Sequence, residues 1–143
     1  MKNLLILFGL LLLSYSSFAQ KSAIGKWKTI DDETGKARSI VEIFEKNGKV
    51  FGKIAELLDD DPSKVCDKCP DDRKDQKIVG LEIIRDMELE EEGLYEEGEI
   101  LDPANGKIYG CILKVSESGE KMEVRGFLGF SLLGRSQEWI KVQ

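Results

Sequence analysis

The chain has 143 residues, a formal net charge of -6 and no histidine. Its acidic balance argues against nucleic acids and anionic membrane surfaces as partners, because both repel a negatively charged protein. The lack of histidine excludes Ser-His-Asp and Cys-His catalysis and removes the commonest ligand of transition metals. No other catalytic constellation stands out, so we expect no enzymatic activity and no cofactor.

Residues 1–19 predict a secretory signal peptide, because Lys2 precedes an apolar run over residues 4–13 and a small residue, Ala19, stands at the cleavage position. The run is shorter than the roughly 20 residues that a membrane-spanning helix needs. No cysteine follows it to carry a lipid anchor. We therefore expect a soluble protein, periplasmic or extracellular, whose mature chain forms one domain over residues 20–143.

Short apolar runs that alternate every second residue, separated by turn residues, predict an all-β fold of about eight strands. Asn47-Gly48 is a hairpin signal, because both residues tolerate positive φ. Repeated hairpins in a short chain favour closure of the sheet, which removes its free edges. An antiparallel up-and-down barrel is thus expected, with a two-sheet β-sandwich as the alternative. The clearest strands are residues 24–30, 38–45, 50–58, 79–85, 108–115, 121–128 and 136–142.

Two charged stretches interrupt this pattern. Residues 59–77 contain two prolines and many charges, which predicts a long surface loop. Residues 86–99 are strongly acidic, and we expect turns at Glu90–Gly93 and Glu96–Gly98, with Tyr95 reaching the core. The acid runs lack the alternating spacing and central glycine of a calcium-binding EF-hand loop, so they predict a solvated face.

The most apolar part of the mature chain is residues 125–139, which contains three glycines. We expect it to form the closing hairpin of the barrel, with the glycine-bounded segment Phe130–Leu133 at the turn and with its apolar side chains buried. Its excess of apolar residues suggests the mouth of a ligand site.

The Gly25-x-Trp27 pattern on the first strand, with an arginine near the last strand available to stack over the indole, resembles lipocalins and related ligand-binding barrels. The chain as a whole resembles a family of small exported bacterial proteins classed as a domain of unknown function. That resemblance implies a lipocalin-like barrel, an envelope or secreted location and no established activity. Its motifs are GKWKT at 25–29, DETGK at 32–36, SIVEI at 39–43, CDKC at 66–69, LDPxNGKxY at 101–109, RGFLG at 125–129 and GRSQxW at 134–139.

The chain has three cysteines. In a cytosolic protein, Cys66-x-x-Cys69 would suggest half of a zinc site or a redox pair, but export favours a structural disulfide. A loop this small gains only about 2 kcal/mol from closure, so the bond should hold the loop rather than the fold. Cys111, which lies outside the family pattern, is expected to be a buried free thiol rather than an intermolecular bridge.

Aromatic side chains and two arginines could line a ligand cavity, although the interior of an eight-stranded barrel can equally be filled by side chains. Arg125 shares a strand face with Glu123 and Phe127, so it binds an anionic group only if that face looks inward. The candidate ligand-binding residues are Trp27, Phe44, Tyr109, Arg125, Phe127, Phe130, Arg135 and Trp139.

Three functions follow from these observations. The first is an exported lipocalin-like protein that binds a small apolar or amphipathic molecule, with Arg125 or Arg135 near the mouth. The second is a structural or interaction protein of the envelope that docks a partner through the acidic segments 59–77 and 86–99. The third is a thiol-disulfide redox protein that uses Cys66 and Cys69.

Overall fold

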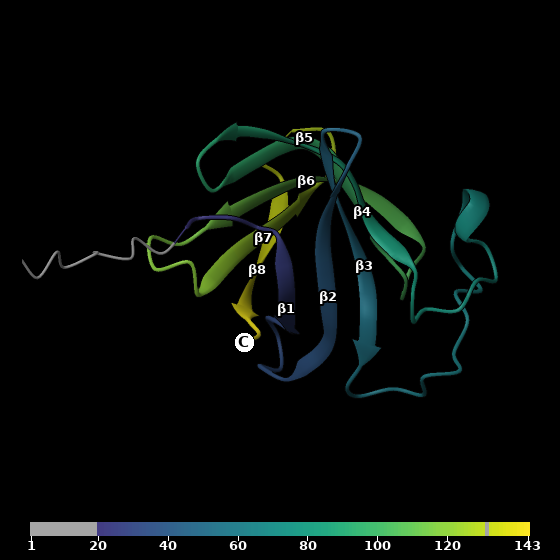
Figure 1. Ribbon diagram of the computed structural model, residues 1–143. Coiled ribbons are helices and arrows are strands. Elements are labelled where there is room, and N and C mark those ends of the chain that lie inside the picture. Colours follow the sequence, from purple (N-terminus) through teal and green to yellow (C-terminus); the bar gives the residue numbers. More distant parts are fainter. Residues whose placement is uncertain (1–19, 131) are drawn as a thin grey trace, which may run out of the picture.

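The computed structural model describes residues 20–130 and 132–143, so the expected signal peptide lies outside the described residues. Eight antiparallel strands form a closed barrel in which each strand pairs with its sequence neighbours and the last pairs with the first (Figure 1). The all-β barrel is therefore confirmed, and the sandwich alternative is wrong. The strands are β1 Gly25–Ile30, β2 Ala37–Lys46, β3 Lys49–Leu57, β4 Glu82–Glu91, β5 Leu94–Asp102, β6 Lys107–Val115, β7 Lys121–Phe127 and β8 Gly134–Lys141.

The acidic stretch 86–99 is mostly strand rather than loop. β4 and β5 form a hairpin that turns at Glu92-Gly93, within the expected first turn, whereas the expected turn at Glu96–Gly98 is wrong. Those residues lie inside β5, where the register shifts at a bulge. The prediction failed because acids on a solvated face leave a strand intact when the other face carries core residues such as Met87 and Tyr95.

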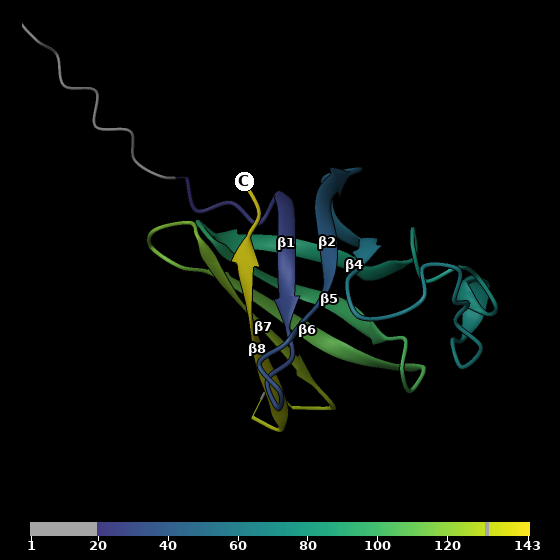
Figure 2. The ribbon, with the colours of Figure 1, turned by 90° about the horizontal axis from the view of Figure 1, so that it is seen from below.

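One end of the barrel is closed by the segment that precedes β1. The indole Nε1 of Trp27 donates to the carbonyl of Ala23 at 2.7 Å, and the amide of Ala23 donates to the hydroxyl of Tyr95 at 3.2 Å. The cation over the Trp27 ring is Lys141, with Nζ 4.6 Å from the ring centroid, so the expected stacking by an arginine is wrong. In Figure 2 the chain end labelled C lies at this closed end, beside the start of β1.

Large side chains fill the barrel next to the closed end. Trp27, Met87, Leu113 and Met122 are completely buried, and Trp139 is almost so. Trp139 lies on β8 opposite Met122, and Trp27 lies on β1 opposite Lys141. This part of the interior is therefore a packed core of the kind expected for eight strands.

The segment between β3 and β4, residues 58–81, folds back onto the outside of the barrel, and we call it the side lobe (Figure 1). Ile84 and Ile100 pair across β4 and β5 and face the interior of the barrel. Their chain neighbours Ile83 and Leu101 therefore face outward, yet Ile83 and Leu101 are buried. The lobe covers Ile83 and Leu101 and also has buried side chains of its own, so the expectation of a plain surface loop over residues 59–77 is wrong for the middle of that loop. The buried residues of the lobe are Cys66, Cys69, Arg73, Ile78 and Leu81.

Specific contacts hold the side lobe in place. Cys66 and Cys69 form a disulfide, and Cys66 Sγ lies 3.6 Å from the carbonyl oxygen of Pro103 in the β5–β6 turn. Arg73, in the short 3-10 helix η1 (Asp71–Arg73), donates from Nη1 to the carbonyl of Glu82 at 3.1 Å and pairs with Asp71. The lobe is thus tied both to the start of β4 and to the end of β5.

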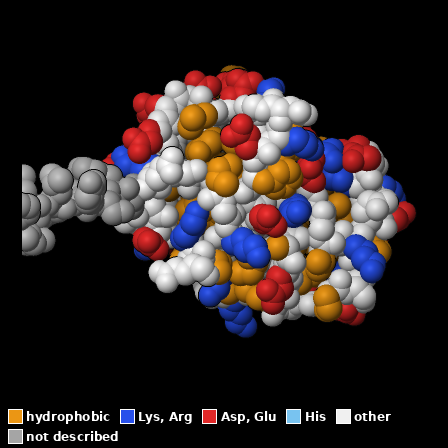
Figure 3. Space-filling model, viewed as in Figure 1, with side chains coloured by type: hydrophobic (Ala, Val, Ile, Leu, Met, Phe, Trp, Pro, Cys, Tyr) orange, Lys and Arg blue, Asp and Glu red, His pale blue; other side chains and the backbone are white. Residues whose placement is uncertain are grey.

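The face of the molecule that includes the side lobe is mixed in character. Acidic and basic side chains are interspersed on the face seen in Figure 3, and hydrophobic side chains lie there in small separate groups. Within the described residues, no helix is long and apolar enough to cross a membrane.

Candidate functional site

The two ends of the barrel differ in the side chains that they present. The end opposite the closed one, which we call the open end, carries the β1–β2 turn, the β5–β6 turn and the loop between β7 and β8 (Figure 2). Polar side chains occupy the inner wall there. Thr29 and Ser39 face each other across β1 and β2, with their hydroxyl oxygens 2.9 Å apart. On β8, the side chains of Gln137 and Arg135 point inward like that of Trp139, because every second side chain along a strand lies on the same face.

A chain of hydrogen bonds runs from the core to the rim at the open end. Trp139 Nε1 donates to Gln137 Oε1 at 3.1 Å, and Gln137 Nε2 donates to Asp32 Oδ1 at 3.4 Å. The guanidinium of Arg135 binds both carboxylate oxygens of Asp32, and hydrogen bonding from Arg135 lowers the pKa of Asp32. Arg135 therefore stands at the mouth with its charge balanced by an acid of the β1–β2 turn.

Tyr109 also faces the interior at the open end. Cys111, two residues further along β6, is completely buried, and Tyr109 packs close to Gly126 of β7. Asn105 in the β5–β6 turn donates to the Tyr109 hydroxyl at 3.0 Å. Trp27, Trp139, Tyr109 and Arg135 are thus the candidate residues that the structure brings to the inner side of the barrel.

Three candidates lie on the outer face instead. Phe44 stacks on Phe51 with ring centroids 6.1 Å apart, under the ammonium of Lys53. Val124 and Met122 of β7 are buried, which turns Arg125 and Phe127 outward. Arg125 donates to the hydroxyl of Ser136 at 3.3 Å, and the Phe127 ring lies directly over Gly110. The inward orientation considered for Arg125 is therefore wrong.

Among the described residues, the loop between β7 and β8, of which residues 128–130 and 132–133 are described, is the most exposed apolar segment, and we call it the rim loop. Leu128 is 55%, Phe130 76%, Leu132 89% and Leu133 70% exposed. The amide of Leu133 donates to the carbonyl of Phe130 at 3.0 Å, so the loop has an ordered turn. The expected burial of this turn is wrong, because its side chains extend beyond the barrel wall. The rim loop meets the open end through Arg135, which follows it by two residues.

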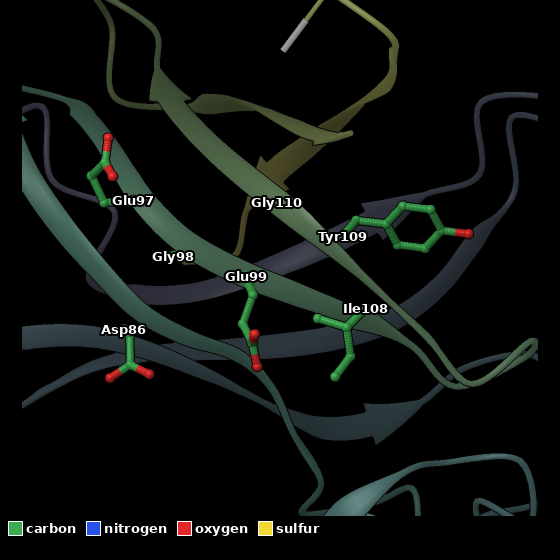
Figure 4. A pocket seen from close by; sticks show the side chains of 7 residues that line it. All are labelled: Asp86, Glu97, Gly98, Glu99, Ile108, Tyr109 and Gly110. Atoms are coloured by element: carbon green, nitrogen blue, oxygen red, sulfur yellow. The ribbon is translucent and has the colours of Figure 1, made fainter. Parts of the chain in front are cut away.

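The outer wall beside the rim loop carries a feature that the sequence did not indicate. Two adjoining hollows, of about 300 and 480 Å3, share Glu97 and Gly98, and we call them together the outer groove (Figure 4). In Figure 4 the Tyr109 ring points away from the acids of the groove, in keeping with its inward position. The groove is lined by Asp86, Glu96, Glu97, Gly98, Glu99, Ile108, Tyr109, Gly110, Cys111, Ile112, Phe127, Gly129 and Phe130.

The cysteines and acids show no reactive centre in the part of the chain that is described. The disulfide sulfurs are buried, at 1% and 3% exposure for Cys66 and Cys69, which favours a structural over a redox role. Cys111 is a buried free thiol, and burial raises its pKa to about 12. Over residues 20–130 and 132–143, no group of three or more potential ligand side chains could hold a metal ion.

Comparisons with known proteins agree with this architecture. A solved structure described as protein HP1028 from the human pathogen Helicobacter pylori, which belongs to the lipocalin family, superposes with a TM-score of 0.76 and 20% identity. The match covers 85% of this chain and 84% of that one, and at this identity it shows the lipocalin-like fold alone. No curated protein matches the chain. The model of the family described as uncharacterized protein conserved in bacteria (DUF2147) matches residues 25–141, and the chain belongs to this family.

Proposed function

We propose that this chain is an exported binding protein for a small apolar or amphipathic molecule, which it holds at the open end of the barrel. The observation that carries the proposal is the difference between the two ends. The N-terminal segment and Lys141 close one end, while the other combines inward polar side chains with an exposed apolar loop. Ligand sites commonly pair apolar surface with a few polar groups that fix orientation, and the mouths of β-barrels are frequent locations for them.

The packed core decides how deep the ligand sits. Trp139 pairs with Thr29 across β8 and β1, and Trp27 lies two residues closer to the closed end, so the ligand rests at the rim above these buried indoles. The rim loop supplies apolar contact through Leu132 and Leu133. Arg135 supplies a cation that can exchange its Asp32 partner for an anionic head group, because a guanidinium forms equivalent paired hydrogen bonds with either carboxylate.

The inner position of Arg135 provides a matched test. cis-Parinaric acid, a fluorescent fatty acid, combines a carboxylate with an apolar chain, and its emission rises when it enters an apolar site. We expect saturable binding that Arg135→Gln weakens by at least about tenfold, the lower end of the range for one charge-assisted hydrogen bond. Arg125→Gln removes the same charge from the adjacent strand β7. Gly126 is the pairing partner of Arg135, and its neighbour Arg125, which pairs with Ser136, points to the outer face. Arg125→Gln should leave the affinity unchanged.

Two results would overturn the proposal. One is the absence of saturable binding of cis-parinaric acid, together with no small molecule detected by native mass spectrometry of protein purified from its own envelope. The other is an equal loss of affinity in Arg125→Gln and Arg135→Gln, which would indicate diffuse electrostatic attraction. Thermal unfolding of both variants, recorded in parallel, controls for loss of the fold.

A further inference from the structure

The outer groove lies on the opposite side of the barrel wall from the proposed ligand site. Ile112, which helps to line it, pairs with outward-facing Arg125 and alternates with the buried residues Cys111 and Leu113. Phe127, on the same outer face, lies over Gly110. A molecule bound in the groove therefore contacts neither Trp139 nor Gln137, and the groove shares only the rim loop, through Gly129 and Phe130, with the proposed site at the open end.

One side of the groove is acidic and lacks basic partners. In the described part of the chain, no lysine or arginine forms an ion pair with Asp86, Glu96 or Glu97. Neighbouring acids on the same two strands differ: Glu88 pairs with Lys49, and Glu99 lies 3.6 Å from Arg73. Asp86, Glu96 and Glu97 thus give the groove negative charge that no ion pair balances, whereas Glu90 and Glu91, which are also without an ion pair among the described residues, lie outside the groove.

Two of these acids share an unusual backbone conformation. Asp86 on β4 and Glu97 on β5 have φ values of 59° and 64°, a region that residues other than glycine seldom adopt. Both lie where the regular pairing is interrupted, between Arg85–Glu99 and Glu88–Glu96. Gly98 permits the bulge, because a Cβ there would lie 2.4 Å from Met87 Sδ. Bulges redirect side chains, and left-handed backbone of this kind is concentrated at functional positions.

The other side of the groove is apolar and continues into the rim loop. Ile112 and Phe127 form its wall, and Phe130, at 76% exposure, stands at its edge. Exposed apolar surface bordered by charge is typical of interaction sites rather than of ordinary protein surface. Since the barrel is closed, it offers no free strand edge to a partner, and recognition must come from side chains.

We propose that the outer groove binds a positively charged, amphipathic peptide segment of a partner protein. Its lysine or arginine side chains would pair with Asp86, Glu96 and Glu97, and its apolar side chains would pack on Ile112, Phe127 and Phe130. The two hollows adjoin along the outer face of several strands, which suits an extended segment better than a compact ligand in an enclosed pocket. The net charge of -6 would also steer a basic segment toward the protein.

The test uses three synthetic ten-residue peptides and the full folded chain. One alternates lysine with leucine, one alternates glutamate with leucine, and one alternates lysine with serine. Calorimetry gives the affinities, and backbone amide shifts in NMR spectra give the location. The lysine-leucine peptide should bind at least about tenfold more tightly than either of the others, because only it supplies both charge and apolar contact. Its shifts should centre on Glu97, Ile112 and Phe127.

Matched variants separate the groove from general attraction to an acidic protein. The double variant Glu96→Gln with Glu97→Gln should weaken binding of the lysine-leucine peptide by about tenfold, as expected for the loss of two charge pairs. Glu90→Gln with Glu91→Gln removes the same charge from an exposed part of β4 outside the groove and should change the affinity less than about twofold. Phe130→Ser, an exposed substitution compatible with the fold, should weaken binding without altering charge.

Several outcomes would overturn the proposal. Equal losses in the two double-glutamine variants, or shifts centred outside the groove, would show nonspecific attraction. Equal binding of the lysine-serine or the glutamate-leucine peptide would show that charge and apolar contact do not act together. Binding of dodecyltrimethylammonium to the groove with greater affinity than the peptide would make it a small-molecule site. The affinity for cis-parinaric acid should be unchanged in the Glu96 and Glu97 variant, which keeps this test separate from that of the open end.

Discussion

The ammonium of Lys141 lies 4.6 Å from the centroid of the Trp27 ring and donates to the carbonyl oxygen of Ile24 at 2.7 Å. This contact joins the last strand to the first at the closed end of the barrel. Burial lowers the pKa of Lys141, and the indole face and the carbonyl oxygen compensate part of that desolvation. Gly25 makes room for the contact, since a Cβ there would lie 2.6 Å from Lys141 Nζ.

Gly25→Ala should therefore destabilise the fold more than an ordinary glycine substitution. At Gly25 the new methyl group meets Lys141 and the backbone φ is 127°, and such positions cost on the order of 1 to 3 kcal/mol. Gly35→Ala is the control, because φ there is 71° but nothing lies within 4 Å of the new Cβ. Urea unfolding measures both. An equal loss of stability in the two variants would show that the contact with Lys141 is unimportant.

The Asp32–Arg135 pair should make a small, pH-dependent contribution to stability. Arg135 lowers the pKa of Asp32 in the folded state, so the contribution is complete above the unfolded value of about 4 and is lost as pH falls through the folded value. Because the pair is partly exposed, Asp32→Asn should reduce the free energy of unfolding at pH 7 by no more than about 1 kcal/mol. Urea unfolding from pH 7 to pH 2.5 should show the difference disappearing. A difference that grows in acid would contradict this assignment.

Cys111 should be chemically inert in the folded protein. Burial raises its pKa to about 12, so the thiol stays protonated at pH 8 and is also inaccessible. Ellman's reagent should detect no thiol in the native protein and one per chain after unfolding without reductant, because Cys66 and Cys69 are joined. Rapid reaction of the native protein would indicate that β6 opens locally.

Breaking the disulfide should loosen the side lobe and leave the barrel folded. Replacing both Cys66 and Cys69 by alanine should lower stability by about 2 kcal/mol, as expected for a short loop. Hydrogen exchange followed by mass spectrometry should show faster exchange over residues 58–81 and little change in β1, β2 and β8. If β1 and β8 exchanged equally fast, the lobe and the barrel would have to unfold as one unit.

The barrel could be predicted because the residues that specify its strands and turns lie close together in the sequence. Alternating apolar residues define both faces of β2 and β7, and Asn47-Gly48 specifies the hairpin after β2, with Asn47 at φ 53° and Gly48 at φ 77°. These features need only a few consecutive residues to specify them. The direction of single side chains was harder to predict, because Trp27, Tyr109 and Trp139 lie inward whereas Phe44 and Phe127, candidates from the same set, lie outward.

The features that were missed depend on partners distant in the sequence. Ile83-Ile84 and Ile100-Leu101 are consecutive apolar pairs because the side lobe buries the outer face of β4 and β5 while the core buries the inner face. Nothing near residues 58–81 in the sequence identifies that surface. The prediction for the rim loop failed for the opposite reason, since its apolar composition predicts burial, whereas Leu132 is 89% exposed. The sequence Glu96-Glu97-Gly98 predicted a turn, but in the structure these residues form a bulge within β5.

The side lobe also limits how this protein can be engineered. Segments that connect two strands are usually tolerant of shortening, but this one is part of the outer wall of the barrel. Deleting residues 59–77 would remove the buried Cys66, Cys69 and Arg73 and uncover Ile83 and Leu101 on β4 and β5. A truncated chain would then expose an apolar stripe and tend to self-associate. Experiments on partners of this protein should therefore substitute individual exposed acids of the lobe and keep its full length.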